Sequence, residues 1–491
     1  MTQAGTLARE DGVRAGGRWS ATKARLAEHF DRLASGQIPW KRNRYYHRDL
    51  ARFIGFLVPE GAQVLEIGCG DGGLLAALRP ARGVGVDLSA GMTQRAARAH
   101  PELRVVQGDA EDLPIDGPFE YVILSDLVGY LEDVQVAFDN LHRVSAPGTR
   151  IVITYFNYLW EPILSLAQRV GIMTPQRRQN WLALADLENL LFLSGFEVIR
   201  SGYRQLLPAS IPGVSWLANR VIAKLPGIRK LCLVHYVIAR PSVRRAPEPA
   251  QASVSVVIPC RNERGNIESA VARMPRMGRS TELIFVDGNS TDGTAAEIER
   301  VANRYRGRWP IALLHQGTGA GKGDAVRKGF AAATGDVLMI LDADLTVPPE
   351  DLPKFYEALT TGKGEFINGT RLVYPMERQA MRTLNLLGNK FFSLAFTWLL
   401  EQRFRDTLCG TKVLFRRDYD RIAANRHYFG DFDPFGDFDL IFGASKLNLR
   451  IVEVPVRYRE RTYGVTNIRR FRHGWLLLRM CLVAFRKLKL N

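Results

Sequence analysis

Residues Val64–Gly73 read VLEIGCGDGG, an apolar strand that runs directly into a glycine-rich turn, and a segment of helical pattern, Leu74–Leu78, follows it. Glycine lets the backbone approach a ligand closely, and a helix N-terminus favours polar or anionic groups. Gly68, Gly70 and Gly73 also fit the GxGxxG spacing of dinucleotide sites. The turn therefore predicts a nucleotide-type ligand, and a nicotinamide dinucleotide stays among the alternatives.

Two further apolar strands of the first half end in acids. The segment GVGVD ends at Asp87, and VVQGDAEDLP places Asp109 just after the next strand. A carboxylate at the first position can accept hydrogen bonds from both hydroxyls of a ribose, and one at the second can meet an adenine amino group. Since the carboxyl ends of parallel strands meet at one edge of a sheet, the glycine turn and both acids are expected in one site.

The order of these elements over Leu50–Pro241 resembles that of class I S-adenosylmethionine-dependent methyltransferases. Phe119–Asp126 (FEYVILSD) is similar to the fourth strand of that family, which faces the methyl group. The resemblance implies an α/β domain with a Rossmann-like seven-stranded methyltransferase fold and S-adenosylmethionine as its cofactor. By the same resemblance, the methionine part is held by Glu66, Gly68 and Gly70, the ribose by Asp87 and the adenine by Asp109.

Methyl transfer needs little from the protein beyond alignment and desolvation, because a sulfonium methyl is already a good electrophile. A neutral hydroxyl acceptor would also require a general base. Asp126 and His142 are the candidates, and the alternative is that Asp126 is a turn residue and His142 a helix-surface residue. The sequence does not identify the acceptor.

The second half repeats the plan of apolar strands that end in polar residues, in VSVVIPCRNE, LIFVDGNSTDGT and GDVLMILDAD. The last of these ends in Asp342 and Asp344. Buried carboxylates are rare unless they are paired or bind a cation, and such oxygen ligands suit Mg²⁺ or Mn²⁺ held partly by a substrate diphosphate. The segment GTGAGKGD places Lys322 in a phosphate-cradle pattern, but Gly323 stands where a P-loop requires Ser or Thr.

These motifs over Ser253–Glu460 resemble those of family-two glycosyltransferases with the GT-A fold, in the branch of the dolichyl- and polyprenyl-phosphate sugar synthases. Thr346 departs from the glutamine that this branch often carries. The resemblance implies a nucleotide-sugar site made of Pro259, Asn262, Glu263, Asp287, Lys322, Asp342 and Arg371. It also implies a metal held by Asp342 and Asp344, with Asp344 counted among the catalytic residues.

The acceptor side is expected at FGDFD, which contains Asp437, and at the arginines that follow residue 456. A sugar hydroxyl would need Asp437 as a general base. A lipid phosphate, whose second pKa is about 6, is already anionic and needs none. Arg457, Arg459 and Arg461 could bind that phosphate, because guanidinium groups pair well with phosphate.

The chain has 67 Lys and Arg against 50 Asp and Glu, a net charge of +17. Seven of these basic residues and no acid lie in 467–491, where Arg472, Arg479 and Arg486 recur every seven residues beside apolar side chains. This pattern predicts a helix at an anionic membrane surface, or a helix that packs on its own domain with a solvated basic face. No nucleic-acid recognition motif is present, so we expect no nucleic-acid partner.

The 491 residues are expected to divide into an N-terminal helical extension (1–50), a methyltransferase domain (51–240), a linker (241–252), a glycosyltransferase domain (253–460) and a basic C-terminal helix (461–491). The favoured function is a bifunctional enzyme that acts peripherally on the cytoplasmic face of a membrane. It would transfer methyl groups, and it would transfer sugar with inversion from a nucleotide sugar to a polyprenyl phosphate or a related lipid or glycan. Two alternatives stay open: a non-catalytic S-adenosylmethionine-binding module beside an active glycosyltransferase, and a membrane-surface scaffold. Nothing in the sequence indicates an oligomeric state.

Overall fold

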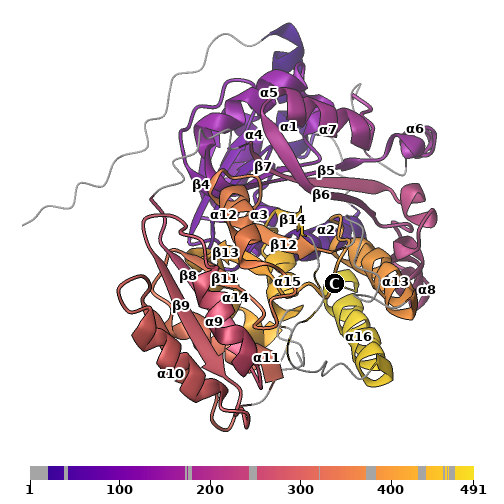
Figure 1. Cartoon of the computed structure of the whole chain (residues 1–491). Helices are drawn as coiled ribbons and strands as arrows, with labels where there is room; N and C mark the ends of the chain where they lie inside the picture. Colours follow the sequence, from indigo (N-terminus) through magenta and orange to yellow (C-terminus); the bar gives the residue numbers. More distant parts are fainter. Residues whose placement is uncertain are drawn as a thin grey trace, which may run out of the picture. The chain divides into compact units, whose positions relative to one another are not determined.

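The computed structural model describes residues 20–37, 43–171, 174, 180–242, 251–319, 321–371, 383–428, 438–456, 459, 461, 463 and 470–490 (Figure 1). For residues 383–390, 427 and 470–474 it describes the backbone alone. The chain divides into two compact units, Met1–Ser242 (unit 1) and Val243–Leu490 (unit 2). Each unit is built around a sheet of seven strands.

The sheet of unit 1 has the strand order β3-β2-β1-β4-β5-β7-β6. Strand β7 runs antiparallel to both of its neighbours, and the other pairs are parallel. The strands are β1 (Gln63–Ile67), β2 (Arg82–Asp87), β3 (Arg104–Gln107), β4 (Phe119–Ser125), β5 (Ser145–Phe156), β6 (Phe196–Arg204) and β7 (Val234–Pro241). This topology confirms the predicted seven-stranded methyltransferase fold.

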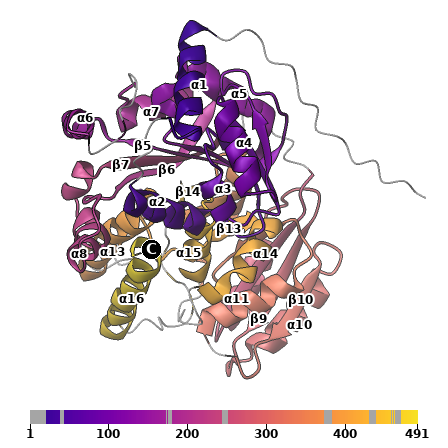
Figure 2. The same ribbon diagram turned by 180° about the vertical axis from the view of Figure 1, so that it is seen from behind.

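Helices cover both faces of this sheet (Figures 1 and 2). They are α1 (Ala21–Ala34), α2 (Arg44–Leu57), α3 (Gly73–Ala77), α4 (Ala90–Ala99), α5 (Val134–Asn140), α6 (Glu161–Arg169), α7 (Leu184–Leu193) and α8 (Val214–Arg220). Helix α2 shows why the sequence forms them: Asn43 caps its N-terminus, and its buried side chains Leu50, Phe53, Ile54 and Leu57 recur at helical spacing.

The sheet of unit 2 is mixed and has the order β10-β9-β8-β11-β13-β12-β14. Strands β10, β9, β8 and β11 are parallel, whereas β13 runs antiparallel to β11 and β12. The strands are β8 (Val254–Cys260), β9 (Thr281–Asp287), β10 (Ile311–His315), β11 (Val337–Ile340), β12 (Phe366–Thr370), β13 (Lys412–Phe415) and β14 (Ile451–Pro455). Three of the four parallel strands, β8, β9 and β11, carry the polar ends that the sequence predicts.

The helices of unit 2 are α9 (Arg264–Ala272), α10 (Thr294–Arg304), α11 (Gly321–Ala332), α12 (Leu352–Thr360), α13 (Thr383–Leu400), α14 (Arg416–Ala424), α15 (Phe438–Lys446) and α16 (Arg470–Ala484). Helices α13 and α16 lie side by side (Figures 1 and 2). Helix α16 buries Leu477, Met480 and Ala484 and exposes Trp475 and Leu482. Among the residues described, no helix combines the length and the apolar character that crossing a membrane requires.

Candidate functional sites

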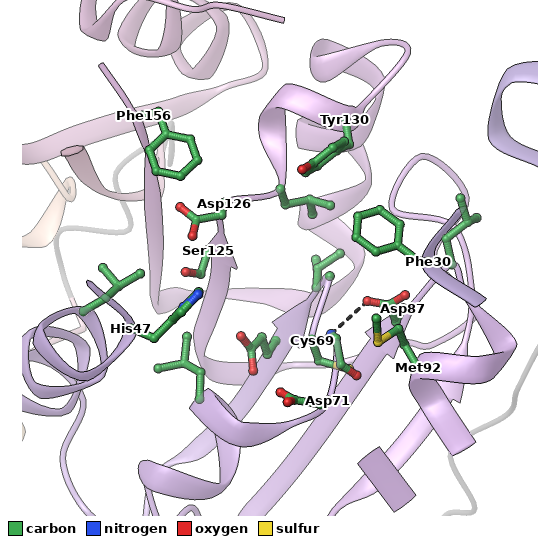
Figure 3. Close-up of a pocket in the computed structure, with 18 of the residues that line it drawn as sticks. Phe30, His47, Cys69, Asp71, Asp87, Met92, Ser125, Asp126, Tyr130 and Phe156 are labelled. Carbon is green, nitrogen blue, oxygen red and sulfur yellow. Dashed lines mark hydrogen bonds between the residues drawn. The ribbon is translucent and has the colours of Figure 1, made fainter. Parts of the chain in front are cut away.

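The glycine turn of unit 1 approaches its surroundings closely. Gly68 and Gly70 have φ values of 76° and 53°, in the left-handed region that favours glycine. The amide of Gly70 donates a 2.8 Å hydrogen bond to Asp87 Oδ2 (Figure 3), and the Ser89 amide donates to Asp87 Oδ1 at 2.9 Å. Burial raises the pKa of Asp87. The turn after β1 is therefore hydrogen-bonded to the acid at the end of β2. The sequence predicts this proximity, because the two strands are parallel neighbours.

Asp109 pairs with a residue of the predicted N-terminal helical extension (1–50). Lys23, on α1, donates to Asp109 Oδ2 at 2.5 Å and to Glu111 Oε2 at 2.9 Å. Burial disfavours the charged amine, but hydrogen bonds to the two carboxylates raise the pKa of Lys23. On the same helix, Asp31 accepts hydrogen bonds from the Ser89 hydroxyl at 2.5 Å and the Gly91 amide at 2.7 Å. Helix α1 is thus tied to the turns after β2 and β3.

A cavity of about 890 Å³ opens at this edge of the sheet (Figure 3). One part is lined by the glycine turn, the strand-end acids and Met92, and it holds every predicted cofactor residue: Glu66, Gly68, Gly70, Asp87 and Asp109. The other part is lined by α2, the end of β5 and α6, and its walls are Tyr46, His47, Asp126, Phe156, Trp160, Ile163, Leu164, Pro208 and Leu233. The cavity therefore offers a polar half beside a mainly apolar half.

The structure separates the two candidate bases. Asp126, with φ of 55°, lies in the cavity after β4 (Figure 3). It accepts a 2.7 Å hydrogen bond from the Tyr46 hydroxyl. His142 lies outside the cavity lining, where its ring stacks on Phe196 and its Nε2 lies 2.7 Å from the Ser194 carbonyl oxygen. Of the two, only Asp126 can reach a molecule in the cavity.

In unit 2 the strand ends meet as predicted for parallel strands. Cys260, at the end of β8, is in register with Asp287, at the end of β9. Asp287 is 4% exposed, and its buried Oδ1 has no hydrogen-bond partner among the described atoms. Asn262 Oδ1 accepts from the Thr291 amide at 2.8 Å. Glu263 is also buried, which raises its pKa. A buried carboxylate oxygen that lacks a donor is a group suited to bind a ligand N–H.

Each of the two acids after β11 faces a cation. Lys322 Nζ lies 2.7 Å from Asp342 Oδ1, and Arg461 Nη2 lies 2.6 Å from Asp344 Oδ2. Although burial opposes ionisation, the Lys322 ammonium holds the pKa of Asp342 below its ordinary value. Arg461 also lies 3.4 Å from Glu263 Oε1. Acids and bases thus neutralise one another at the strand ends.

Within the described residues, no three His, Cys, Asp or Glu side chains gather in a cluster that could hold a metal ion. Asp342 and Asp344 can together supply two carboxylate oxygens, which are hard ligands. This donor set fits Mg²⁺ or Mn²⁺ bound by one or two carboxylates, with the remaining ligands from water and substrate phosphates.

The remaining predicted residues either have other partners at this edge of the sheet or lie outside the described residues. Arg371 is 9% exposed, and its Nε and Nη2 each donate at 2.7 Å to the fully buried carboxylate of Asp406. Arg459 is exposed, and its amide donates to the Thr346 carbonyl. Pro259 is the penultimate residue of β8. Asp437 and Arg457 lie outside the described residues.

Sequence reasoning missed the contributions of α1 and α2 to the cavity. Lys23, Phe30, Tyr46 and His47 all line it. The amphipathic pattern of 20–57 gave a usable signal, since it predicts a buried face, but it does not say against which surface that face packs.

Comparison with protein families assigns a class to each unit. Residues 40–201 match the family model described as a methyltransferase domain, and residues 255–422 match that of glycosyl transferase family 2. The chain thus joins a methyltransferase domain to a family 2 glycosyltransferase domain, as the motifs predict.

Among curated proteins, dolichol-phosphate mannosyltransferase of Saccharomyces cerevisiae is 38% identical over 110 residues, which are 21% of this chain and 40% of that protein. The undecaprenyl-phosphate 4-deoxy-4-formamido-L-arabinose transferase of Edwardsiella ictaluri is 28% identical over 217 residues, 43% of this chain and 61% of that enzyme. The matches thus span less than two thirds of these relatives' own length.

Solved structures are similar to each unit at low identity. A methyltransferase from Thermotoga maritima, described as S-adenosylmethionine-dependent, is 16% identical with a TM-score of 0.33, and covers 45% of this chain and 97% of its own. Glucosyl-3-phosphoglycerate synthase of Mycobacterium tuberculosis is 19% identical with a TM-score of 0.36, and covers 48% of this chain and 80% of its own.

Proposed function

We propose that unit 2 transfers a sugar, with inversion, from a nucleotide sugar to a polyprenyl phosphate or a related lipid or glycan, and that unit 1 transfers a methyl group from S-adenosylmethionine. The observation that supports glycosyl transfer most directly is a group of acidic and basic side chains at neighbouring strand ends. Its members are Glu263, Asp287, Asp342, Asp344, Lys322 and Arg461. The names of the curated relatives, which include a dolichol-phosphate and an undecaprenyl-phosphate transferase, support a lipid phosphate as the acceptor.

In this proposal, Asp287 Oδ1 accepts a hydrogen bond from the nucleotide base, since it is buried without a donor. Lys322 and Arg461 exchange their present carboxylate partners for the diphosphate. Asp342 and Asp344 would hold Mg²⁺ or Mn²⁺, which when bound neutralises charge on the leaving diphosphate. A lipid-phosphate acceptor is anionic at neutral pH, so Asp437 positions this acceptor, and it serves as a base only for a hydroxyl acceptor.

In unit 1, the proposal assigns the polar half of the cavity to the methyl donor. Glu66 and the glycine turn hold its amino-acid part, Asp87 its ribose and Asp109 its adenine. The sulfonium supplies an electrophilic methyl group. Asp126, with Tyr46 as its donor, orients an acceptor in the apolar half and takes the proton of a hydroxyl acceptor. The transfer itself depends on alignment and on the exclusion of water.

The C-terminal helix supports peripheral attachment to a membrane. Trp475, Leu478 and Leu482 are 69%, 44% and 59% exposed, and Arg486 is exposed close by. An exposed apolar row with neighbouring cations suits an anionic bilayer surface. The opposite face of α16 is buried, so packing on its own unit and attachment are compatible.

Glycosyl transfer is tested with the full chain, Mn²⁺, polyprenyl phosphate and a panel of radiolabelled nucleotide sugars. We expect transfer to the lipid with one of these donors. Asp344→Asn should lower the rate by about a hundredfold or more, since it removes a metal ligand. The matched control is Asp420→Asn, because Asp420 is an exposed acid on α14. Equal rates in Asp344→Asn and the wild type would refute the metal site.

Cofactor binding is tested by calorimetry with S-adenosylmethionine. We expect binding by the wild type and by Asp139→Asn, which changes an exposed acid on α5, and much weaker binding by Asp87→Asn. Absence of heat with the wild type would exclude a methyl-donor site. Binding without methyl transfer to any cellular fraction would favour the alternative of a non-catalytic binding module.

A further inference from the structure

The apolar half of the cavity in unit 1 continues into an exposed apolar surface. Strands β5 and β6 are each antiparallel to β7 and therefore run in the same direction. Helix α6 follows the carboxyl end of β5, and residues 205–231, which include α8, link the end of β6 to the start of β7. All of these segments leave or enter the sheet at the edge that carries the glycine turn. Figures 1 and 2 both show α6 on the outside of unit 1.

This edge holds most of the large apolar side chains that the described part of the chain exposes. We define the carboxyl-edge patch as Tyr158, Leu159, Ile163, Leu166, Val170, Ile211, Val214, Trp216, Leu217, Leu225 and Leu231, each of which is between 45% and 60% exposed. Apolar residues scattered singly over a surface need no explanation, but a group of them at one edge of a sheet marks a candidate interaction site.

The cavity and the patch share residues. Ile163 lines the cavity and is 54% exposed, so it belongs to both. Pro208 lines the cavity at the start of the loop that leads to Ile211 and Val214. The indole Nε1 of Trp160, another lining residue, donates a 2.8 Å hydrogen bond to the carbonyl of Leu231 in the patch. An apolar molecule at the patch would therefore lie next to the acceptor half of the cavity.

The charged residues around the patch indicate which kind of partner it binds. Residues 205–233 contain no Asp or Glu and four Lys and Arg, of which Arg220 and Lys224 are buried. Lys230 and Arg169 are exposed at the patch, where Glu161 is the one acid of α6. An acid-free basic segment that displays Trp216 with aliphatic side chains has the composition of a surface that lies in the interface of an anionic bilayer. Docking of a protein partner of ordinary composition would not explain why residues 205–233 contain no Asp or Glu.

We propose that the carboxyl-edge patch docks on an anionic membrane surface, and that the methyl acceptor is a lipid-linked molecule that enters the cavity from that membrane. The acceptor part of this inference rests on the proposed methyl transfer. The apolar chain would stay in the bilayer and against the patch, while the reactive group reaches Asp126 past Trp160 and Ile163. The inference concerns unit 1 alone and does not depend on helix α16.

Docking is tested by sedimentation of the full chain with phosphatidylcholine vesicles that contain or lack phosphatidylglycerol. All variants carry Trp475→Ser, Leu478→Ser and Leu482→Ser, so that α16 contributes little. On this background, Trp216→Ser with Leu217→Ser should weaken binding to the anionic vesicles by about tenfold or more, because burial of two large apolar side chains is lost. Binding should also fall as salt increases.

The matched control is Phe192→Ser with Leu193→Ser. These residues are 69% and 55% exposed at the end of α7, just before β6 begins, and hence lie at the opposite edge of the sheet. We expect the control to bind like its parent. Equal binding by the Trp216 variant and the control would overturn the docking surface. Binding to neither vesicle type would also overturn it, and would favour a protein partner for the patch.

The acceptor is tested with the methyl-labelled donor, the full chain, and the lipid-soluble and water-soluble fractions of cells that carry this chain. Label in the lipid-soluble fraction, reduced by the Trp216 variant but not by the Phe192 variant, supports the inference. Label in the water-soluble fraction alone overturns the lipid-linked acceptor and leaves methyl transfer intact. Label in neither fraction refutes the proposed methyl transfer and this acceptor with it, whereas the vesicle result still decides the docking surface.

Discussion

The Tyr46 hydroxyl donates a 2.7 Å hydrogen bond to Asp126 Oδ1, and this bond joins helix α2 to the residue that follows β4 inside the cavity of unit 1. Burial, and then the negative charge of Asp126, raise the pKa of Tyr46 well above its ordinary value. Tyr46 therefore keeps its proton and remains a donor at any pH at which the protein is assayed. The bond fixes the direction in which Asp126 faces an acceptor.

Tyr46→Phe should slow methyl transfer by about ten- to a hundredfold, because a hydrogen bond to a charged group contributes about 1.5–3 kcal/mol. Binding of the methyl donor, measured by calorimetry, should change little, since Asp126 is assigned to the acceptor. Tyr45→Phe is the matched control: Tyr45 is on the same helix, and its hydroxyl accepts from Asn219 outside the cavity lining. A wild-type rate in Tyr46→Phe would count against the role of Asp126.

Lys23→Met should weaken binding of the methyl donor by about tenfold, because it leaves Asp109 and Glu111 without their shared cation beside the adenine position. The amides of α1 should also exchange hydrogen for deuterium faster, since the helix loses a tie to the body of unit 1. Arg25→Met, a change at an exposed position of the same helix, serves as the control. Unchanged affinity would place the adenine away from Asp109.

The strand-end acids could be predicted from sequence because each directly follows an apolar strand, and parallel strands bring their carboxyl ends together. The partners of these residues could not. Lys23 lies 86 residues from Asp109, and Arg371 lies 35 residues from Asp406. No local pattern encodes such pairings. The same limit applies to residues 1–50, which the sequence predicts to be an N-terminal helical extension: periodicity shows that a helix has a buried face but not which surface covers it.

Glu453 should make the stability of unit 2 fall as pH rises. Burial, and then the charge of Asp406, raise the pKa of Glu453 to about 7 from an ordinary value of 4.5. The folded state therefore holds this proton more tightly than the unfolded state. Stability from this group is greatest below about pH 4.5 and is lost progressively up to about pH 7, by a total of about 3 kcal/mol.

Glu453→Gln should remove this dependence, since glutamine can keep the acceptor oxygen that meets the amides of Arg405 and Asp406. The variant should gain stability over the wild type as pH rises from about 5 to about 8. The measurement is the opening free energy of the β12 and β14 amides by hydrogen exchange at both pH values. Glu299→Gln, at an exposed position of α10, is the control. If the difference in opening free energy between Glu453→Gln and the wild type stays constant from about pH 5 to about pH 8, Glu453 is ionised in the folded protein.

Arg371 is expected to act by holding Asp406 rather than by touching the donor. Two of its guanidinium nitrogens bind a carboxylate that is fully buried, so Arg371→Ala should destabilise unit 2 by about 3–5 kcal/mol, the cost of leaving a buried charge unpaired. That loss alone would abolish activity and hide any role in binding. Arg371→Met combined with Asp406→Leu removes both charges and should recover most of the stability, because apolar pairs of similar volume replace buried ion pairs well.

In this double variant we expect the KM for the nucleotide sugar to stay within about threefold of wild type. A folded double variant with a KM raised by about tenfold or more would instead show that the guanidinium contacts the sugar phosphate.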